Sequence, residues 1–381
     1  MVDLALSPEQ DLLKTHVRSY LEDRCPKAFI RSIDESPESF DRAFWSETSE
    51  LGWPATLIPE AYGGTGSSLM DAAVLFEELG WACIPSTVFS SAVLGALSII
   101  ASGSKEHAER LLPQIASGNK IVTVALTEPE HSWAFSSIKM GATANQNSYV
   151  LDGVKLFVPD AQVADTILVL ARTAAGADGL TLFEVERDAP GVAVRKVTGW
   201  TGDRLNEVSF NSVSVSKSAV LGEAGAAGAF MEDALAKSIL ILSAYMVGGM
   251  QQMSDLSTEY SRNRIAFGVP ISTFQRVQDM IITIVNDLES ARWVTYESIW
   301  KMEQGFAPDQ LSRAVSMTKA VASEGFASAT EQAHYVHGGV SVDKGYGLYL
   351  YTKKSRSLYN YLGSPQYHRK LMARTFGLGA A

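Results

Sequence analysis

The order of its secondary-structure signals constrains the fold of this chain more than any other feature. Up to about residue 120 the pattern is mainly helical, from Lys120 it is rich in short β-type runs, and from Ala229 the helical period returns. Short strands at close spacing predict a small antiparallel barrel or sandwich of roughly 100 residues. The chain is therefore expected to be α+β, with an N-terminal helical domain (1–120), a middle antiparallel β domain (121–226) and a C-terminal four-helix bundle (227–381).

The middle region contains several runs that read as separate strands. Residues 148–151 and 155–158 are divided by the turn pair Asp152 and Gly153, and residues 208–210 and 213–215 form a second such pair of runs. Turn residues between short apolar runs usually end strands, so four strands are predicted here.

The C-terminal region carries the strongest helical patterns. Apolar residues recur at i, i+3, i+4, i+7, i+11 and i+14 over residues 277–291, which places them on one stripe of a helix. The most apolar run, 239–250, is shorter than the roughly 20 residues of a membrane span. It also contains Gly248 and Gly249. It is predicted to be a helix buried on all sides, and with the stripe after it to form the packing core and an oligomer contact.

Composition and charge narrow the class of protein. A chain of 381 residues with 46% apolar and 19% charged residues is typical of a globular protein with two or three domains. The net charge of −10 and the lack of a Lys/Arg cluster argue against a nucleic-acid partner. Two cysteines, Cys25 and Cys83, cannot form a disulfide framework and suit a reducing compartment. No signal peptide is visible at the N-terminus, so a cytoplasmic location is expected.

Six short motifs follow one another along the chain. They are residues 58–66 (IPEAYGGTG) with 77–79 (EEL), 126–129 (LTEP), 153–158 (GVKLFV), 264–271 (RIAFGVPI) with 274–275 (FQ), 337–339 (HGG), and 363–366 (GSPQ). In order and spacing these motifs resemble those of the acyl-CoA dehydrogenase family over nearly the whole length.

The resemblance implies an activity and its partners. It implies a flavoprotein oxidoreductase that removes two hydrogens from the α and β carbons of an acyl-CoA, with a carboxylate taking the α proton and FAD accepting the β hydride. It also implies homo-oligomers or complexes with a second subunit of the family, and electron-transfer flavoprotein as an electron acceptor. No metal site is expected, because His107, His334 and His337 have no Cys or carboxylate at ligand spacing.

The same resemblance assigns cofactor-binding roles residue by residue. Leu126 and Thr127 are expected at the polar edge of the flavin, Phe157 against its ring, and Arg264 at the pyrophosphate, where a planar cation suits phosphate oxygens. Phe267, Gln275, Gly338 and Gly339 are expected to face the dinucleotide, and Phe157 and Phe267 are the candidates expected to be plain core residues if FAD is absent. Ser364 and Gln366 are further cofactor-binding candidates.

The chain departs from the family pattern where the chemistry should occur. The two positions at which relatives carry the catalytic Glu are here Leu362 and Ser238, and neither side chain can act as a carboxylate base. Pro159 stands where a threonine is expected beside the reactive edge of the flavin, and it has neither an N–H nor a hydroxyl. Residues 130–133 (EHSW) replace the family's G-S-D segment. No catalytic residue is therefore identified.

Other titratable residues were considered as a replacement base. Glu77 and Glu78 are adjacent on a predicted helix, so one of them is expected to be a solvated surface charge. His131 and His337 are expected in loops near the site. The other acids considered are Glu128, Glu130 and Asp343.

The pattern of losses suggests a hypothesis about assembly. The departures affect the half of the site that faces flavin ring and substrate, whereas Arg264, Gln275 and the glycine pair remain. In the family such features commonly reach into the flavin site of a neighbouring subunit. This combination resembles the base-less partner chains of heteromeric acyl-CoA dehydrogenases, heterotetramers that act in the bacterial catabolism of sterol side chains and other bulky acyl-CoAs. Two alternatives remain open: FAD-dependent acyl-CoA chemistry such as elimination, and a non-catalytic acyl-CoA-binding or oligomerisation module.

Overall fold

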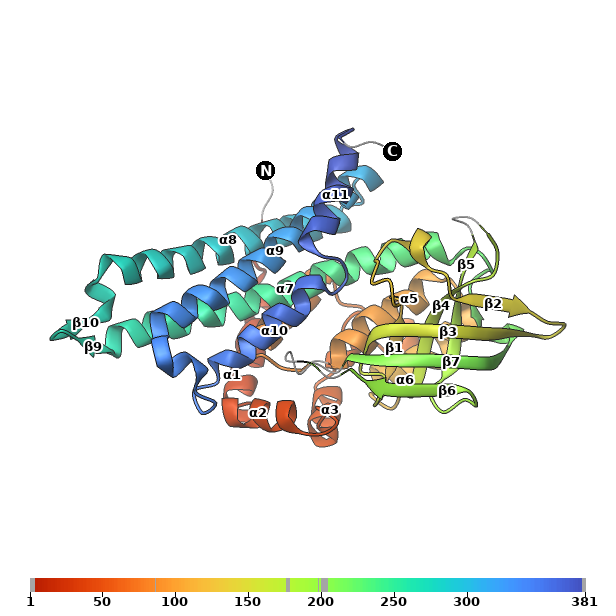
Figure 1. Ribbon diagram of the computed structural model, residues 1–381, viewed down its shortest axis with the longest axis horizontal. Helices are drawn as coiled ribbons and strands as arrows, with labels where there is room; N and C mark the ends of the chain where they lie inside the picture. Colours follow the sequence, from red (N-terminus) through yellow and green to blue (C-terminus); the bar gives the residue numbers. More distant parts are fainter. Residues whose placement is uncertain (1–3, 86, 176–178, 198, 200–204, 379–381) are drawn as a thin grey trace. The chain divides into compact units, whose positions relative to one another are not determined.

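The chain forms two compact units in the computed structural model, which describes residues 4–85, 87–175, 179–197, 199 and 205–378. The bundle unit consists of Met1–Glu35, Leu69–Pro85 and Ile239–Ala381, and the sheet unit of Ser36–Ser68 and Ser86–Ser238. The N-terminal helical region is thus divided between the two units. The α+β class and the order of helical, β-sheet and helical regions are confirmed (Figure 1). The boundaries at 120 and 226 stay predictions.

An eight-stranded sheet organises the described part of the sheet unit. The strand order is β6-β7-β3-β2-β4-β5-β8, with β1 beside β4. Most neighbours are antiparallel, whereas β1 and β2 both pair with β4 in parallel. The strands are β1 Val122–Ala125, β2 Gly141–Ala144, β3 Ser148–Pro159, β4 Thr166–Arg172, β5 Leu180–Glu186, β6 Val192–Lys196, β7 Leu205–Ser216 and β8 Val220–Leu221.

Two predicted strand breaks are wrong, because β3 and β7 each run without interruption. The ladder between them shifts register between Leu151 and Gly153, and again between Lys155 and Val158. These shifts are β-bulges, in which an extra residue bends a strand without ending it. Gly153 has a φ of 150°, and a Cβ there would lie 2.7 Å from Cγ of Met140. At the first shift the extra residue lies on β7, where residues 211 and 212 stand opposite Asp152 alone. Asp152 and Gly153 therefore lie within a continuous β3 and do not form a turn.

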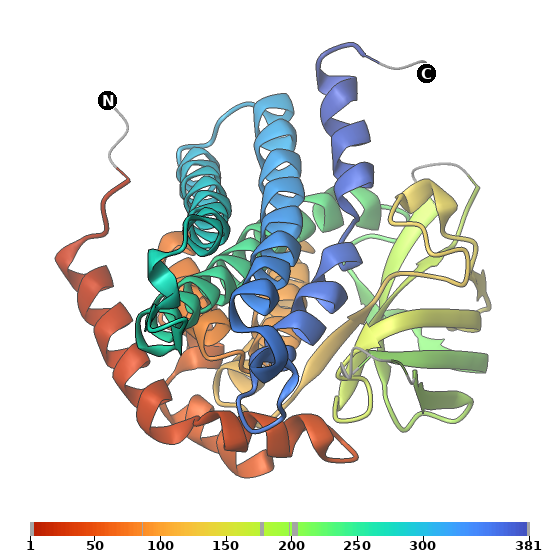
Figure 2. The ribbon, with the colours of Figure 1, turned by 60° about the vertical axis from the view of Figure 1, so that its left-hand side comes forward.

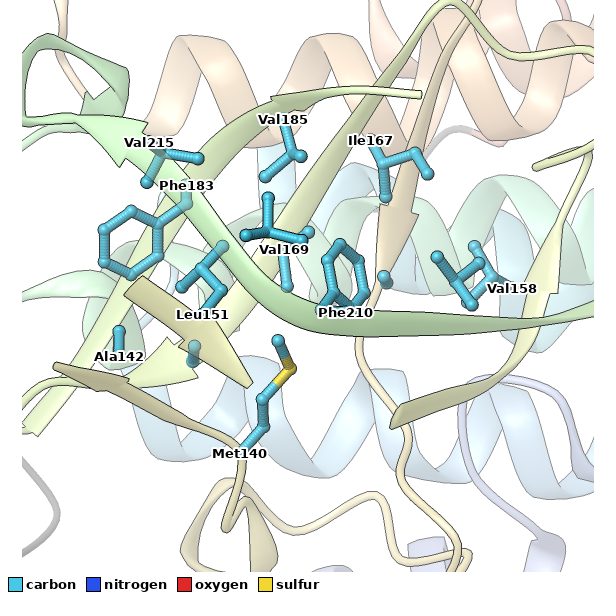
Figure 3. Close-up of a cluster of buried hydrophobic side chains, with 14 of the residues drawn as sticks. Met140, Ala142, Leu151, Val158, Ile167, Val169, Phe183, Val185, Phe210 and Val215 are labelled. Carbon is cyan, nitrogen blue, oxygen red and sulfur yellow. The ribbon is translucent and has the colours of Figure 1, made fainter. Parts of the chain in front are cut away.

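Alternating side chains of this sheet build the core of the sheet unit. Leu151, Val169, Phe183 and Phe210 are all buried and face one another in a single cluster (Figure 3). The same unit contains several short helices. They are α3 Arg42–Glu50, η1 Trp53–Ala55, η2 Glu60–Tyr62, the π-helix η3 Phe89–Gly95, α5 Ala96–Ala101, α6 Lys105–Ala116, η4 Phe135–Ser137 and η6 Lys217–Ala219.

Long helices make up the bundle unit. Helices α8 and α9 form an antiparallel pair joined by a short loop (Figures 1 and 2). Helix α7 begins in the sheet unit and continues through the bundle unit. The elements are α1 Pro8–Arg24, α2 Lys27–Glu35, α4 Leu69–Trp81, α7 Ala227–Asn263, β9 Ile265–Ala266, β10 Val269–Pro270, η7 Ile271–Thr273, α8 Gln275–Glu303, α9 Pro308–His337, η8 Gly338–Val342, α10 Leu348–Asn360 and α11 Pro365–Thr375.

The apolar run 239–250 lies inside α7 and is buried, as its pattern predicts. A Cβ on Gly248 would lie 1.7 Å from the carbonyl oxygen of Glu77, and a Cβ on Gly80 would lie 1.9 Å from that of Tyr245. The main chains of α4 and α7 therefore touch at this crossing, which only glycine permits. Across the described ranges, no helix combines the length and the apolar character needed to cross a membrane.

The expectation that one of Glu77 and Glu78 faces solvent is wrong. The two residues are 1% and 0% exposed. Glu77 accepts a hydrogen bond from the hydroxyl of Tyr296 (2.7 Å) and lies 3.3 Å from Arg292 Nη2, while Glu78 pairs with Arg18. Helix α4 is covered by other helices on more than one face, so adjacent side chains find partners in different directions. Buried carboxylates are tolerated because each has a cationic partner.

We predict that Gly248→Ala destabilises the bundle unit by about 3 kcal/mol or more, because the new methyl group forces α4 away from α7. Urea unfolding measures the loss. Gly141→Ala is the matched control, since a Cβ there meets nothing within 4 Å. Equal stability of the two variants would contradict the close helix crossing.

Removal of the Glu77 carboxylate tests the buried ion pairs. We predict that Glu77→Leu costs about 3 kcal/mol, because Arg292, whose side chain is only 14% exposed, keeps its charge and loses this partner. The control is Glu289→Gln. Glu289 pairs with the same arginine, but the side chain of Glu289 is 42% exposed. A change below about 1 kcal/mol is expected for that control in the same urea titration. A similar cost for both variants would show that burial of the pair is unimportant.

Candidate functional site

In the sheet unit, Thr127 lies just after β1 and is hydrogen-bonded to β3. Its hydroxyl donates to the carbonyl oxygen of Leu156 (2.5 Å), and its own carbonyl accepts from the N–H of Leu156 (2.8 Å). Thr127 is buried, and the lone pairs of its hydroxyl remain available as acceptors. These bonds fix Leu126 and Thr127 beside the bulged part of β3.

Phe157 lies at the second register shift, where β3 carries the extra residue. Its φ is 56°, and the ladder to β7 shifts register at this point. A bulge re-aims the side chain that it carries. The ring of Phe157 is half-buried and lies 4.9 Å from the ring of His131, centroid to centroid. The structure thus brings Leu126, Thr127 and Phe157 together, and adds His131 to them.

A buried ion pair supports this corner of the sheet unit. Lys155 Nζ donates to Glu128 Oε1 (2.8 Å) and to the carbonyl oxygen of Leu126 (3.1 Å). The carboxylate of Glu128 also accepts the N–H groups of Lys139 and Met140. Burial lowers the pKa of Lys155 to about 8. Glu128 is thereby committed to structure and is a poor candidate for the missing base.

Pro159 ends β3 and offers only an acceptor. Its carbonyl oxygen receives the hydroxyl of Thr123 at 2.6 Å. No donor from residue 159 can therefore reach a ligand, as its residue type predicts.

In the bundle unit, the β9–β10 hairpin carries Arg264 and Phe267. Phe267 is 96% exposed and has a φ of 54°, so the expectation that it is a core residue without FAD is wrong. Within the described residues, no carboxylate pairs with the exposed guanidinium of Arg264. Gln275 begins α8 and is also exposed. Arg264, Phe267 and Gln275 are thus all exposed, at or just after a short hairpin whose strands are two residues long.

Gly338 and Gly339 follow α9 at the same end of the bundle unit. His337 is the last residue of α9, where it is buried and stacks on Tyr260 with ring centroids 4.5 Å apart. The expectation that His337 lies in a loop is therefore wrong. A Cβ on either glycine would meet no atom within 4 Å. Crowding within the described chain does not require glycine here, and there is room for a group from outside it.

The segment 362–366 lies between α10 and α11, away from the hairpin (Figure 1). Leu362 is 3% exposed and has a φ of 57°. Ser364 is the N-cap of α11 and accepts the N–H of Tyr367 (3.1 Å), while Gln366 is exposed. The structure thus separates Ser364 and Gln366 from Arg264 and the glycine pair.

Neither position at which a carboxylate is expected can act as a base. Leu362 is apolar, and Ser238 is buried in α7 with its hydroxyl donating to the carbonyl oxygen of Ala234 (2.7 Å). Among the other acids, Glu130 pairs with Lys139 at the surface, and Asp343 accepts the N–H groups of residues 345 and 346 in a turn. His131 remains as an exposed titratable group beside Phe157.

Sequence reasoning missed two buried residues next to Leu362. His368 Nε2 donates to the carbonyl oxygen of Leu362 (2.9 Å), and Lys319 Nζ donates to that of Gly363 (3.1 Å). The available signal was a lysine within the alanine-rich buried stretch of α9. No cluster of three or more His, Cys, Asp or Glu side chains in the described ranges is arranged to hold a metal ion.

The residues fit FAD in part. An exposed unpaired cation at Arg264 and open space at Gly338 and Gly339 suit the phosphates of a dinucleotide. Thr127 and the neighbouring main chain offer hydrogen bonds to a ring edge, but Pro159 offers no donor. The residues expected to face the nucleotide therefore suit it, while the set expected to face the flavin ring is incomplete.

Comparisons with known proteins agree with this arrangement. Three family models match the chain: the N-terminal domain of acyl-CoA dehydrogenase over residues 7–119, its middle domain over 123–213 and its C-terminal domain over 228–377.

Similar individual proteins span nearly the whole chain. Acryloyl-CoA reductase (NADH) of Anaerotignum propionicum is 27% identical, covering 98% of this chain and 95% of the relative. Cyclohex-1-ene-1-carbonyl-CoA dehydrogenase of Syntrophus aciditrophicus is 29% identical, with 97% and 90% covered. The solved Tcur3481-Tcur3483 steroid ACAD is 26% identical, with a TM-score of 0.86 over 97% of this chain and 98% of that chain.

We predict that Arg264→Gln weakens FAD binding about tenfold or more, because one charge-assisted contact to the pyrophosphate is lost. Flavin retained by the purified oligomer or complex measures the effect. Arg276→Gln, at the second position of α8, is the matched control, since Arg276 is also exposed. Unchanged flavin retention in Arg264→Gln would remove Arg264 from the cofactor site.

Proposed function

The chain belongs to the acyl-CoA dehydrogenase family, and we propose that it is the base-less subunit of a heteromeric acyl-CoA dehydrogenase. The family consists of oxidoreductases that act on CH–CH bonds, and its cofactor is FAD. In the proposed complex a second, Glu-bearing chain of the same family supplies the base. This chain completes the flavin site of that partner.

The proposal rests on the residues found at the two positions where relatives carry the catalytic Glu. Leu362 and Ser238 are buried, and the hydroxyl of Ser238 is already engaged within its own helix. A base must be titratable and within reach of the proton that it removes. The chain therefore lacks the means to abstract an α proton at either position used by relatives.

The distribution of exposed groups supports a role in a neighbour's site. Arg264, Phe267 and Gln275 project from the hairpin end of the bundle unit with no partner for the guanidinium in the described chain. An exposed cation beside an exposed aromatic ring is typical of a surface that another molecule covers. In the proposed complex, Arg264 holds the pyrophosphate of FAD in the partner's site.

The chemistry divides between the two chains. FAD, when bound, accepts the hydride from the β carbon of the acyl-CoA. This chain contributes charge at the pyrophosphate through Arg264, space for the dinucleotide at Gly338 and Gly339, and no proton acceptor at position 362. The partner's Glu removes the α proton, and electron-transfer flavoprotein is the proposed electron acceptor.

The proposed substrate class is a bulky acyl-CoA, such as the thioester of a steroid side chain. The similarity to the solved Tcur3481-Tcur3483 steroid ACAD supports this class, because that name includes the word steroid. The same name joins two designations, which agrees with an assembly of two different chains. Position 362 is compatible with a bulky acyl group, because it carries an apolar leucine where relatives carry a charged glutamate.

The experiment is to purify the chain alone with FAD supplied, then together with a Glu-bearing relative. We expect little flavin absorbance from the chain alone and no bleaching by a straight-chain or a polycyclic acyl-CoA. The complex is expected to hold FAD and to be bleached by the polycyclic thioester. Replacing the partner's Glu by Gln should abolish this bleaching.

Stoichiometric FAD in the chain alone, with turnover of ordinary acyl-CoAs, would overturn the proposal. Flavin bound alone with release of a β substituent would favour elimination. An absence of flavin under every condition would favour a binding or oligomerisation module.

Leu362→Glu separates a missing base from an incomplete site. We predict that this variant alone remains unbleached by either thioester, because Pro159 still withholds a donor from the ring edge. Leu362→Gln is the control for the added polar group. Bleaching of Leu362→Glu, but not of Leu362→Gln, would mean that the chain holds a complete flavin site that lacks only its carboxylate.

A further inference from the structure

Lys319 is a fully buried cation that has no carboxylate partner in the described chain. It lies in α9, and its three N–H donors are within hydrogen-bond distance of four oxygens. These are Oγ of Ser323 (2.7 Å) and the carbonyl oxygens of Leu358 (3.1 Å), Tyr359 (3.3 Å) and Gly363 (3.1 Å). A buried lysine without a counter-charge is costly, so its contacts indicate a specific role.

Three of the four acceptors are main-chain carbonyl oxygens. Leu358 and Tyr359 lie in the last turn of α10, where carbonyl groups have no partner within the helix. A cation near a helix C-terminus is also favoured by the helix dipole. Through Gly363, the same ammonium group extends from α10 to the turn that follows it. Lys319 thus joins the end of one helix to the next connection.

The turn that it reaches is strained. Leu362 adopts the left-handed conformation, which is unfavourable for leucine because its Cβ crowds the following carbonyl oxygen. Gly363 has a φ of 107°, and a Cβ there would lie 2.4 Å from Nε2 of His368. Strained backbone persists only where the surroundings hold it.

A second buried donor holds the same turn. His368 donates from Nε2 to the carbonyl oxygen of Leu362 at 2.9 Å. Burial lowers the pKa of His368 to about 4, so the ring is neutral near pH 7 and donates a single N–H. Lys319 and His368 therefore bind two successive carbonyl groups, those of Gly363 and Leu362.

We propose that Lys319 is a positioning residue which, with His368, fixes the Leu362–Gly363 turn from inside the bundle unit before cofactor, substrate or partner binds. The functional meaning rests on the proposed function, in which position 362 faces the chemistry of the site. In that case the turn holds a rigid apolar side chain where relatives carry the base. It also fixes the position of Ser364, the N-cap of α11.

Hydrogen exchange on the isolated full-length chain tests this inference without flavin or partner. At about pH 6, below the pKa of about 7 that burial gives Lys319, the side chain has three N–H donors. Lys319→Met keeps the volume of the stem and removes the donors. Peptides covering residues 358–366 should then exchange about tenfold faster or more, while peptides of α8 keep their rates.

Two further variants separate hydrogen bonding from packing. Lys319→Gln keeps a donor amide and should restore part of the protection, which a role in packing alone would not predict. Lys155→Met removes the other buried lysine, in the sheet unit, and should leave residues 358–366 unchanged.

The inference is overturned if residues 358–366 exchange freely in the natural chain, or if Lys319→Met and Lys319→Gln leave their protection unaltered. If Lys319→Met does not fold, His368→Phe is the deciding variant. It removes the N–H that binds the carbonyl oxygen of Leu362, and it should make the same peptides exchange faster. If exchange shows no role for Lys319, the proposal that this chain is a partner subunit is unaffected. If the chain turns out not to be a partner subunit, the role of Lys319 in holding the turn is likewise unaffected.

Discussion

Main-chain contact between α4 and α7 is the constraint on which the bundle unit depends. Gly80 and Gly248 let the two helices approach until a single added methyl group would overlap a carbonyl oxygen. At that distance Glu77 and Glu78 are both enclosed, and each needs a cation from a neighbouring helix. The polar network inside the unit is therefore a consequence of close backbone packing, because buried carboxylates cannot remain unpaired.

Buried lysines fix the main chain at one critical point in each unit. Lys155 binds Glu128 and the carbonyl oxygen of Leu126, so the strand end that carries the proposed flavin-edge residues is supported from within the sheet unit. Lys319 binds the end of α10 and the turn at Gly363 in the bundle unit. In both cases an ammonium group satisfies carbonyl oxygens that regular secondary structure leaves without a donor.

The departures from the family pattern and the exposed groups lead to one interpretation. The positions expected to face the flavin ring lack donors and carboxylates, whereas those expected to face the nucleotide present a cation, an aromatic ring and open glycine backbone. A chain that acted alone would need both sets in one site. A chain that completes a neighbour's site needs only the second set, and the proposed heteromeric complex assigns it that role.

The sequence by itself determined the helix–strand–helix order, the buried helix over 239–250, the family, and the absence of a carboxylate at positions 362 and 238, because these follow from periodicity, motif order and residue type. It failed where a side chain's environment depends on distant segments. The bulges that keep β3 and β7 whole, the burial of both Glu77 and Glu78, the exposure of Phe267 and the contacts of Lys319 all require partners far along the chain. Only the tertiary structure decided them, since local pattern records which face is apolar but not what covers it.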